Sequence, residues 1–289
     1  MARHLHIDPF SGIAGDMFLG ACIDLGVDLD AIRSALSKLP VERPYEITTN
    51  RVQRHGIGAI DLKVKLLDEK PVASDVVGHH KHHDHKHDHH HDHGHGDHDH
   101  EHGHHHHTGY REIMAMVDDL DTTPRGRERA GRVVTRLAEA EARVHAKSLD
   151  EIHFHEVGAV DSIVDMLGSV VALEHLEVDT VSCGPLPISR GFVKCDHGIM
   201  PVPAPATAYL MQGMPTIGVD RTGELVTPTG AALIAGICNS HGPSPAMTIN
   251  EVGYGAGDRE NPDVPNLLRL ILGETNAPGE LGPLTPNPN

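Results

Sequence analysis

The sequence contains no tryptophan and few aromatic residues of any kind, because Phe, Trp and Tyr together make up 3% of its 289 residues. Basic residues are also scarce: 24 Lys and Arg stand against 41 Asp and Glu, which gives a formal net charge of −17. Binding to nucleic-acid phosphates or to anionic membrane surfaces requires clustered Lys and Arg. The charge balance therefore argues against both kinds of partner.

Long apolar runs are missing as well. None approaches the roughly 20 residues that a membrane-spanning helix needs, and the N-terminal MARHLHIDPF has no apolar signal-peptide core. The four cysteines, Cys22, Cys183, Cys195 and Cys238, are scattered and form no C-x-x-C pair. A disulfide framework is therefore not expected, and a reducing cytoplasm is the predicted location.

Histidine, in contrast, is abundant, and 18 of the 27 histidines lie in one tract with Asp, Glu, Lys and Gly but no large apolar residue. Such a segment cannot bury enough apolar area to fold, so residues 70–108 are predicted to be disordered when metal-free. Imidazole suits Ni, Cu and Zn, so we expect the tract to bind one of these metals. The alternative is a solvated spacer whose metal affinity is incidental. The tract consists of His79, His80, His82, His83, His85, His87, His89, His90, His91, His93, His95, His98, His100, His102, His104, His105, His106 and His107.

The rest of the chain alternates between helical and strand-like patterns, which predicts an α/β or α+β fold with a mixed sheet and packed helices, interrupted by the disordered His-rich insertion. Residues 1–69 and 109–276 would form one domain, and the Pro/Gly-rich residues 277–289 a disordered tail. The expected helices are 15–25, 28–39, 111–119, 124–146, 161–176, 203–212 and 228–239. The expected strands are 4–7, 45–52, 60–67, 179–183, 248–253 and 266–272.

A first candidate site is DPFSGIAGD at residues 8–16, where a strand runs through a Ser/Gly loop into a helix. Backbone N–H groups at such a helix start hold anions, which makes Ser11, Gly12 and Gly15 candidate phosphate-binding residues. Asp8 and Asp16 are alternatively candidate metal ligands. The simpler alternative is a tight turn in which Asp16 caps the helix.

A second candidate site combines two imidazoles and three carboxylates in HFHEVGAVDSIVD, residues 153–165. If residues 153–155 are extended, His153 and His155 face the same side. Asp161 and Asp165 share one helix face at i,i+4 spacing, and Glu156 lies in the preceding turn. This set suits metal binding or acid–base chemistry. The alternative is a helix cap at Asp161 and a hydrogen-bonded core histidine.

Two further segments carry weaker signals. In the first, Cys195 and His197 flank an aspartate and could contribute soft metal ligands or, less specifically, a nucleophile pair. Arg190 and Lys194 of the same segment are candidate anion contacts, and a structural loop with a buried cysteine is the alternative.

The last segment is the helix start ELVTPTGAA, whose Thr227 and Thr229 could hold an anion. Helix capping alone would also explain these two threonines.

Several blocks resemble the LarC family of nickel-insertion proteins: HIDPFSGIAGDMFLGACIDLG, HFHEVGAVDSIVDMLGS, GFVKCDHGIMPVPAPAT, ELVTPTGAA and GYGAGDRENPDVPNLLRLILGETN. The resemblance runs from residue 3 to about residue 276, apart from the His tract. It implies a nickel chelatase of the lyase class. The substrate would be pyridinium-3,5-bisthiocarboxylic acid mononucleotide, into which nickel is inserted through nickel–sulfur and nickel–carbon bonds. The product would be the nickel-pincer nucleotide cofactor of lactate racemase-type enzymes.

The resemblance also implies partners that this chain does not supply. Family members continue past a Glu-Thr-Asn such as residues 274–276 into a C-terminal domain that binds CTP with Mg or Mn, whereas here the sequence departs from the pattern. We therefore expect a separate C-terminal half, arising from a frameshift or a split gene. An apo-enzyme that receives the cofactor and a homo-oligomer are further expected partners.

The residue chemistry and the resemblance combine into one hypothesis. The His tract would collect Ni(II), which His153, His155 and a nearby carboxylate would then hold transiently. Because the nickel–carbon bond replaces a ring proton, a base is required, and Glu156 or Asp161, with Asp16 nearby, is the predicted acid–base group. The alternative function is a nickel store or metallochaperone without chemistry of its own, and a zinc or copper buffer is a third.

Overall fold

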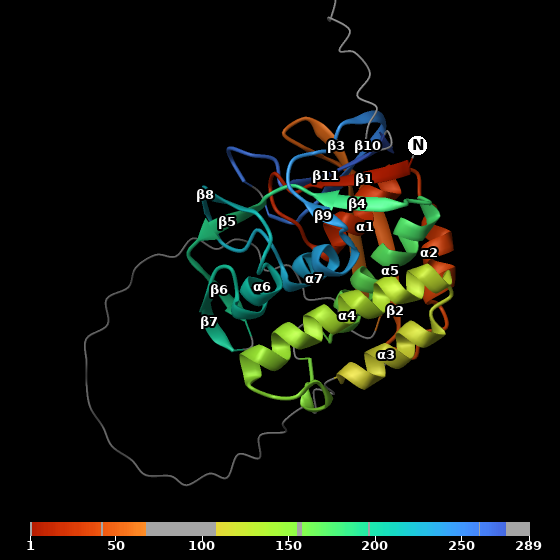
Figure 1. The fold of residues 1–289 in the computed structure, drawn as a ribbon, viewed down its shortest axis with the longest axis vertical. Coiled ribbons are helices and arrows are strands. Elements are labelled where there is room, and N and C mark those ends of the chain that lie inside the picture. The colour runs from red at the N-terminus through yellow and green to blue at the C-terminus, as the bar shows by residue number, and fades with distance from the viewer. Residues whose placement is uncertain are drawn as a thin grey trace, which may run out of the picture. The chain divides into compact units, whose positions relative to one another are not determined.

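The computed structural model describes residues 2–41, 43–67, 108–154, 158–195, 197–259 and 261–275. These residues belong to one compact unit of mixed α/β structure, which confirms the predicted fold class (Figure 1). Most of the predicted His-rich insertion and all of the predicted tail lie outside the described residues. The helices are α1 (Gly15–Asp24), α2 (Leu29–Leu36), α3 (Tyr110–Asp119), α4 (Pro124–His145), the 3₁₀ turn η1 (Leu149–Glu151), α5 (Val160–His175), α6 (Pro205–Leu210) and α7 (Pro228–Ile237).

A seven-stranded mixed sheet has the strand order β2-β3-β10-β11-β1-β4-β9. In it β1 is parallel to β4, and β4 is parallel to β9, whereas β1 is antiparallel to β11. Two small two-stranded sheets, β5-β8 and β6-β7, are separate from it. The strands are β1 (Ala2–Asp8), β2 (Tyr45–Arg54), β3 (Ile57–Leu66), β4 (Thr180–Cys183), β5 (Leu186–Arg190), β6 (Phe192–Cys195), β7 (Gly198–Pro201), β8 (Thr216–Thr222), β9 (Ser240–His241), β10 (Met247–Ala256) and β11 (Leu267–Thr275).

Local signals explain where several helices begin. Asp28 caps α2, because its carboxylate accepts a hydrogen bond from the N–H of Asp30 at 3.0 Å. Thr123 caps α4, which starts with a proline at its first position, where the missing N–H costs nothing. The β2-β3 hairpin turns through His55 and Gly56, both at positive φ, as expected for a two-residue turn that matches the twist of its strands.

The strand β1 is buried on both faces. Leu5 and Ile7 belong to the apolar core. On the other face, the imidazole nitrogens of His4 lie 2.8 Å from the hydroxyls of Thr180 and Ser182. Burial lowers the pKa of the His4 imidazole, so this histidine is neutral near pH 7 and structural.

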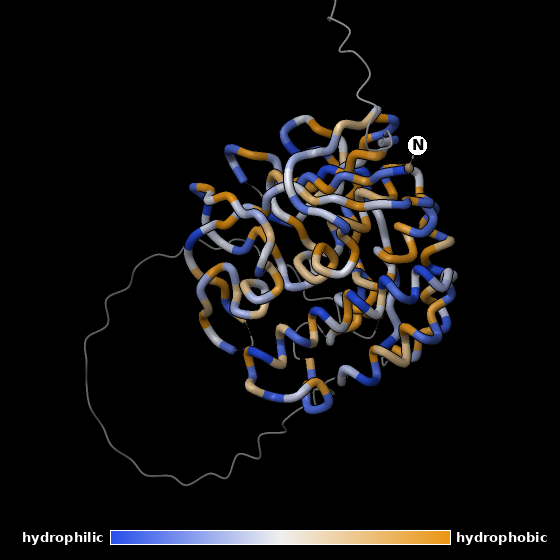
Figure 2. The backbone as a smooth tube through the Cα atoms, viewed as in Figure 1, coloured by the Kyte–Doolittle hydropathy of each residue, from blue (hydrophilic) through white to orange (hydrophobic). Residues whose placement is uncertain are grey.

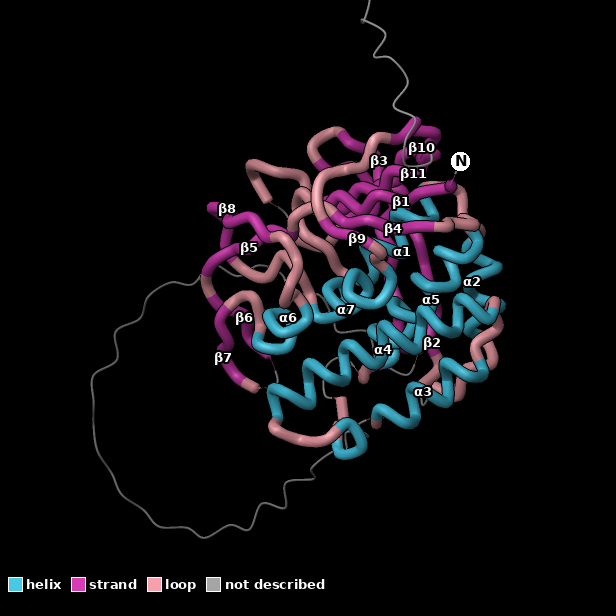
Figure 3. Tube along the Cα trace, viewed as in Figure 1, coloured by secondary structure: helices cyan, strands magenta, loops and turns pink. Residues whose placement is uncertain are grey.

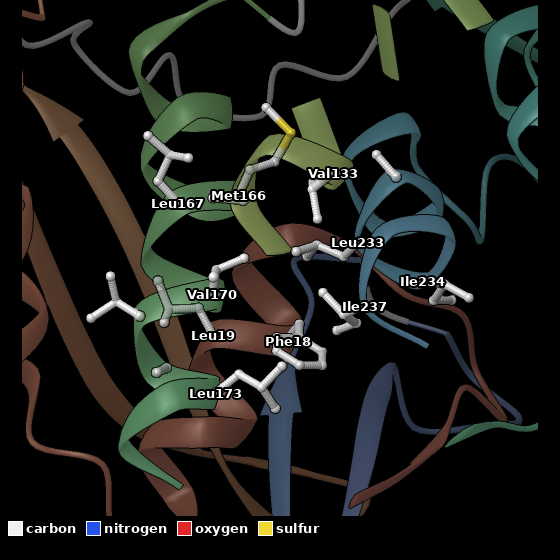
Figure 4. Close-up of a cluster of buried hydrophobic side chains, with 14 of the residues drawn as sticks. Phe18, Leu19, Val133, Met166, Leu167, Val170, Leu173, Leu233, Ile234 and Ile237 are labelled. Carbon is white, nitrogen blue, oxygen red and sulfur yellow. The ribbon is translucent and has the colours of Figure 1, made fainter. Parts of the chain in front are cut away.

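The core lies where α1, α5, α7 and α4 meet, and Figure 4 shows Phe18 of α1 beside side chains of α5 and α7. Figure 2 shows hydrophilic residues alternating with apolar ones along α4, whose apolar side faces the other helices. Each fully buried Leu, Ile or Phe contributes about 1.5–3 kcal/mol relative to an exposed one. Most of the helices gather on one side of the sheet (Figure 3).

The helix α1 packs closely against β10, and Gly255 is what permits this approach. A Cβ placed on Gly255 would lie 1.8 Å from the carbonyl oxygen of Met17. No side chain fits there, so the glycine brings the backbone of the sheet directly against the first turn of α1. This contact fixes the position of the loop between β1 and α1.

The sequence patterns missed the short strands β5, β6, β7, β8 and β9. These strands have two to seven residues, and several of their side chains are exposed. A short strand that is not buried on one face lacks the alternation from which strands are predicted. Their pairing is therefore set by tertiary contacts.

Candidate functional site

Two of the predicted helix starts lie side by side at the carboxyl end of β1. The N–H of Ile13 donates to the carbonyl of Leu225, and the N–H of Thr227 donates to the carbonyl of Ile13, at 2.9 and 3.0 Å. Gly12, at a φ of +113°, lies against Leu225. The loop that begins α1 is thus paired with the loop that begins α7, although the two are far apart in the sequence.

The first turn of α1 also meets the first turns of α5. A Cβ placed on Gly15 would lie 2.6 Å from the Cβ of Asp165. The backbone N–H of Asp16 donates a hydrogen bond to the Asp165 carboxylate. Gly15 therefore allows the carboxylates of Asp16 and Asp165 to become neighbours, one from each helix.

This carboxylate pair is strongly perturbed. Burial raises the pKa of Asp16 to about 6, against the opposing charge of Lys63. Burial, and then the charges of Asp16 and Asp161, raise the pKa of Asp165 well above its ordinary value. Oδ1 of Asp165 is enclosed and has no hydrogen-bond partner among the described residues. Because two adjacent carboxylates do not readily ionise together, the pair keeps a proton to a higher pH than isolated carboxylates do.

Three residues from other elements complete a carboxylate cluster, which we define as Asp16, Asp61, Asp165 and Asp258 around Lys63. On β3, Nζ of Lys63 lies 2.8 Å from Oδ1 of Asp61, and it also forms an ion pair with Asp258, which follows β10. One ammonium group thus faces four carboxylates. The excess of negative charge favours binding of a proton or a cation.

Beside this cluster lies a site with the opposite character. Arg221 donates from Nη1 to the hydroxyl of Ser11 at 2.8 Å and from Nη2 to the carbonyl of Phe10 at 2.9 Å. Ser11 is buried. The loop before α1 therefore contacts a guanidinium group at Ser11 and leads into the carboxylate of Asp16, a combination that suits a ligand with both anionic and cationic parts.

A family model described as nickel insertion protein matches residues 5–282 of the chain. The chain belongs to the nickel insertion protein family. This is the LarC-type family that the sequence motifs resemble.

Several curated relatives of this family carry the name "Putative nickel insertion protein". One from Geotalea uraniireducens (strain Rf4) is 41% identical over 276 residues, covering 95% of this chain and 62% of the relative. Others from Geobacter sp. (strain M21) and Syntrophotalea carbinolica are each 42% identical, covering 93% and 96% of this chain and 61% of each relative. The chain thus spans about three-fifths of the length of these relatives. No solved structure matches it.

Within this nickel insertion family member, Asp8 and His153 do not join the carboxylate cluster. Asp8 forms an ion pair with Arg269, whose Nε lies 2.9 Å from Oδ2. His153 is exposed and pairs through its backbone with Gly109, while the adjacent Phe154 is buried. Asp161 is also exposed and accepts a hydrogen bond from the N–H of Ser162 at 2.8 Å. The helix cap of α5 is Ala159, so Asp161 is not the cap.

The third predicted segment also lies elsewhere. Cys195 and His197 belong to the β6-β7 hairpin, where the ring of His197 lies 4.9 Å from that of His145 at the end of α4. Figure 1 shows this hairpin well apart from α1. Arg190 is ion-paired with Asp220, and Lys194 is exposed on β6. None of these four predicted residues contributes to the cluster.

At the start of α7 the capping interpretation accounts for both threonines. The hydroxyl of Thr227 accepts from the N–H of Gly230 at 3.2 Å and lies 3.0 Å from the hydroxyl of Thr229. Both hydroxyls are therefore engaged within the helix start. Their contribution to the site is to fix the loop that pairs with Ile13.

Some predictions fall outside the described residues, namely those for His155, Glu156 and the 18 histidines of the tract. Within the described ranges, no group of three or more His, Cys, Asp or Glu is arranged to hold a metal ion. None of the helices described there is long and apolar enough to cross a membrane.

Sequence reasoning missed Asp61, Lys63, Asp258 and Arg221. Asp61 and Lys63 are two residues apart on a predicted strand, so their side chains lie on one face. That spacing could have indicated an ion pair there. Nothing local to residues 221 or 258 indicates their partners. Those contacts arise because β3, β8 and the loop after β10 are brought to the start of α1.

Proposed function

We propose that this chain takes part in nickel insertion, with Ni(II) as a substrate and pyridinium-3,5-bisthiocarboxylic acid mononucleotide as the acceptor. The observation that carries the proposal is the family match over residues 5–282. The proposed place of this reaction is the cytoplasm. The product would be the nickel-pincer nucleotide that a lactate racemase-type apo-enzyme receives.

The proposed reaction releases a proton, and the Asp16–Asp165 pair is suited to accept it. Two nickel–sulfur bonds and one nickel–carbon bond form, and the ring carbon loses its hydrogen as a proton. A general base works best when its pKa lies near the operating pH. The pKa of Asp16 is raised to about 6, so this carboxylate is ionised at neutral pH yet remains basic. Asp165, whose pKa is raised by burial and by the charge of Asp16, would hold a proton beside this base.

The hard oxygen ligands of the carboxylate cluster also suit the proposed handling of nickel. Carboxylates bind Ni(II) less well than sulfur ligands do, so nickel near the cluster would pass readily to the thiocarboxylates. Because no described trio of side chains is arranged to hold a metal, the substrate itself would supply ligands during transfer. The phosphate of the acceptor would lie at the Ser11 loop, near the guanidinium of Arg221.

The alternative function, nickel storage, is supported by the His tract. The tract would bind Ni(II) through many different sets of histidines, either to supply the insertion reaction or to store the metal. In the insertion mechanism, deleting residues 79–107 raises the nickel concentration required and leaves the maximal rate unchanged. In the storage mechanism, the same deletion removes nearly all function, and the carboxylate cluster tolerates substitution.

We extend the proposal to the co-substrate and to partners. CTP with Mg or Mn would drive insertion and would be bound by the portion of the relatives' length that this chain does not match. That portion would act as a C-terminal half in the reaction, and a homo-oligomer of this chain is compatible with the proposal. Each of these points is an arm of the assay below.

The test is nickel insertion into the purified acceptor, followed by the absorbance and mass of the product. Reactions would contain the full chain, Ni(II), CTP and Mg or Mn, each omitted in turn, with and without the C-terminal portion of a relative. We expect product when all components are present, and its loss in Asp165→Asn. Absence of product in every arm, with nickel still bound by the chain, would favour storage.

A further inference from the structure

A hollow of about 420 Å³ lies beside the carboxylate cluster and is not used by the proton transfer proposed above. Gly191 and Phe192 line it from the β5-β6 connection, Thr222 and Gly223 from the end of β8, and Arg259 and Asn261 from the loop after β10. In Figure 1, the loop after β10 (dark blue) lies close to β8.

The walls of this hollow are continuous with the site. Arg221, which contacts Ser11, directly precedes the wall residues Thr222 and Gly223. Asp258, which is ion-paired with Lys63 of the cluster, directly precedes Arg259. A ligand bound in the hollow would therefore extend from it toward the loop before α1 and the Asp16–Asp165 pair.

One wall offers an aromatic ring to solvent. The side chain of Phe192 is 70% exposed, which is unusual in a chain that contains only four phenylalanines. Stacking an aromatic ring against a second flat ring is favourable, so the exposed Phe192 offers a flat ligand a surface on which to stack.

Another part of the lining offers positive charge. Arg259 donates from Nη1 to the carbonyl of Glu224 at 2.9 Å, and its guanidinium lies against Gly223, where a Cβ would be 2.4 Å from Nη1. The nearby carboxylates of Asp220 and Asp258 are ion-paired with Arg190 and Lys63. No ion pair joins Arg259 to a carboxylate of the described residues, which leaves its charge for a ligand.

Asn261 adds a second donor. Asn261 lines the hollow, and its Nδ2 is buried without a hydrogen-bond partner among the described residues. A buried amide that lacks an acceptor is costly, and an oxygen of a ligand would satisfy it. Ring, guanidinium and amide together suit a planar group that carries negative charge.

We infer that this hollow binds the planar anionic part of the substrate, with an aromatic ring stacked on Phe192 and an acidic substituent paired with Arg259. The inference rests on the proposed function, because it assigns a binding place to that substrate class. Binding here would hold the ring of the nucleotide with its reacting carbon toward the Asp16–Asp165 pair and its phosphate toward the Ser11 loop.

A second hollow, of about 460 Å³ between α4, α6 and α7, is the natural comparison because it also contains arginine and an aromatic ring. There Arg136 is ion-paired with Glu139 at 3.0 Å. Arg143 is stacked over the ring of Tyr209 and donates to Gln212 at 2.9 Å. The cations of that hollow are already satisfied within the protein, so it serves as the control site.

The test is binding of nicotinic acid mononucleotide, a pyridine ring with carboxylate, ribose and phosphate, to the full chain without nickel, measured by calorimetry. We expect Phe192→Ala and Arg259→Gln each to raise the Kd about tenfold, since a stacked base or a charged hydrogen bond contributes about that much. Ribose 5-phosphate lacks the ring and its acidic substituent, so its Kd should respond to neither Phe192→Ala nor Arg259→Gln.

Two control variants keep the result interpretable. Ile199→Ala removes a side chain that is 73% exposed on the neighbouring strand β7, and Arg136→Gln alters the second hollow. Neither should change the Kd. Unchanged binding by Phe192→Ala and Arg259→Gln, loss of binding in Arg136→Gln, or no binding by the unmodified chain would each overturn the inference.

The nickel insertion assay separates this inference from the function on which it rests. If product forms and the probe binds Phe192→Ala and Arg259→Gln as tightly as the unmodified chain, the hollow is not the binding place, and nickel insertion remains supported. Probe binding that follows the predicted pattern, with no product in any arm, would keep the hollow as an anionic-ligand site and reject the function.

Discussion

The helix α5 carries two carboxylates, a half-buried one toward its start and a buried one toward its end, and their pKa values are shifted in opposite directions. Near its start, Asp165 has an enclosed oxygen without a partner, and burial and the neighbouring charges raise its pKa. Near its end, burial alone would raise the pKa of Glu174. Hydrogen bonds from Thr123 and Arg125 and the charge of Arg129 lower it instead.

The difference lies in what surrounds each acid. Oε1 of Glu174 accepts a hydrogen bond from Arg129 at 2.5 Å, and Oε2 accepts from Thr123 at 2.6 Å. Those partners come from α4 and its cap, so the ion pair joins two helices. Asp165 instead faces other acids and one shared lysine. A satisfied buried charge indicates a structural role, whereas an unsatisfied one in a polar cleft indicates chemistry.

The largest expected effect is on the chemistry at Asp165. Asp165→Asn keeps the shape of the side chain and removes its ability to bind or release a proton, so nickel insertion should fall about 10²–10⁴-fold, the usual contribution of acid–base catalysis. Circular dichroism should show an intact fold. The exposed Asp118 on α3 supplies the matched control, Asp118→Asn, which should keep full activity. Full activity in Asp165→Asn would show that Asp165 has no part in the chemistry.

The next effect is on stability at Glu174. Glu174→Gln leaves the buried guanidinium of Arg129 without its counter-ion, which should lower the free energy of unfolding by about 3–5 kcal/mol. Urea denaturation would measure this change. The exposed pair of Glu128 and Arg132 on α4 provides the control, since Glu128→Gln should cost less than about 1 kcal/mol. Equal losses in both variants would contradict the structural role of Glu174.

Raising the pH should have opposite effects on the stability contributed by Asp16, in the carboxylate pair, and by Glu174. The pKa of Asp16 rises from 3.8 to about 6 on folding, so its contribution is complete below pH 3.8 and is lost as the pH rises through 6. Between pH 4 and 7, the free energy of unfolding of Asp16→Asn should therefore increase by up to about 3 kcal/mol relative to that of the unmodified chain. Glu174, with a lowered pKa, stabilises the protein above its ordinary value of 4.5, and this stability is lost as the pH falls.

Urea denaturation of Asp16→Asn and Glu174→Gln across this pH range tests the signs. As the pH rises, the stability of Asp16→Asn relative to the unmodified chain should increase, while that of Glu174→Gln should decrease. Parallel curves would show that the two carboxylates do not differ as described.

The smallest effect concerns Lys63. Its charge lowers the pKa of Asp16, so Lys63→Gln should raise that pKa further, and NMR titration of the carboxyl carbon would detect the change. Lys65→Gln, two residues along β3 at an exposed position, is the control. A pKa that does not move in Lys63→Gln would place the lysine outside the electrostatics of the pair.

Much of the fold could be predicted because its signals are local. The cap at Asp28, the Pro start of α4 after Thr123, and the apolar period of α5 each indicate an element from neighbouring residues. Asp16 and Asp165 were both candidates for the same reason: each is an acid in an apolar helix start. Asp8 was also a candidate, yet Arg269 of β11 neutralises it, and no local pattern reports an antiparallel neighbour from the far end of the chain.

The sequence by itself determined the family, the mixed α/β class and the acids placed at the starts of α1 and α5. The tertiary structure decided which of those acids meet. Gly15 lets Asp165 reach Asp16, and the packing of α1 on the sheet brings Lys63 to the same place. Helix periods and caps are encoded over a few residues, whereas the balance of partners around a buried charge depends on which distant elements pack together, and that balance sets its pKa.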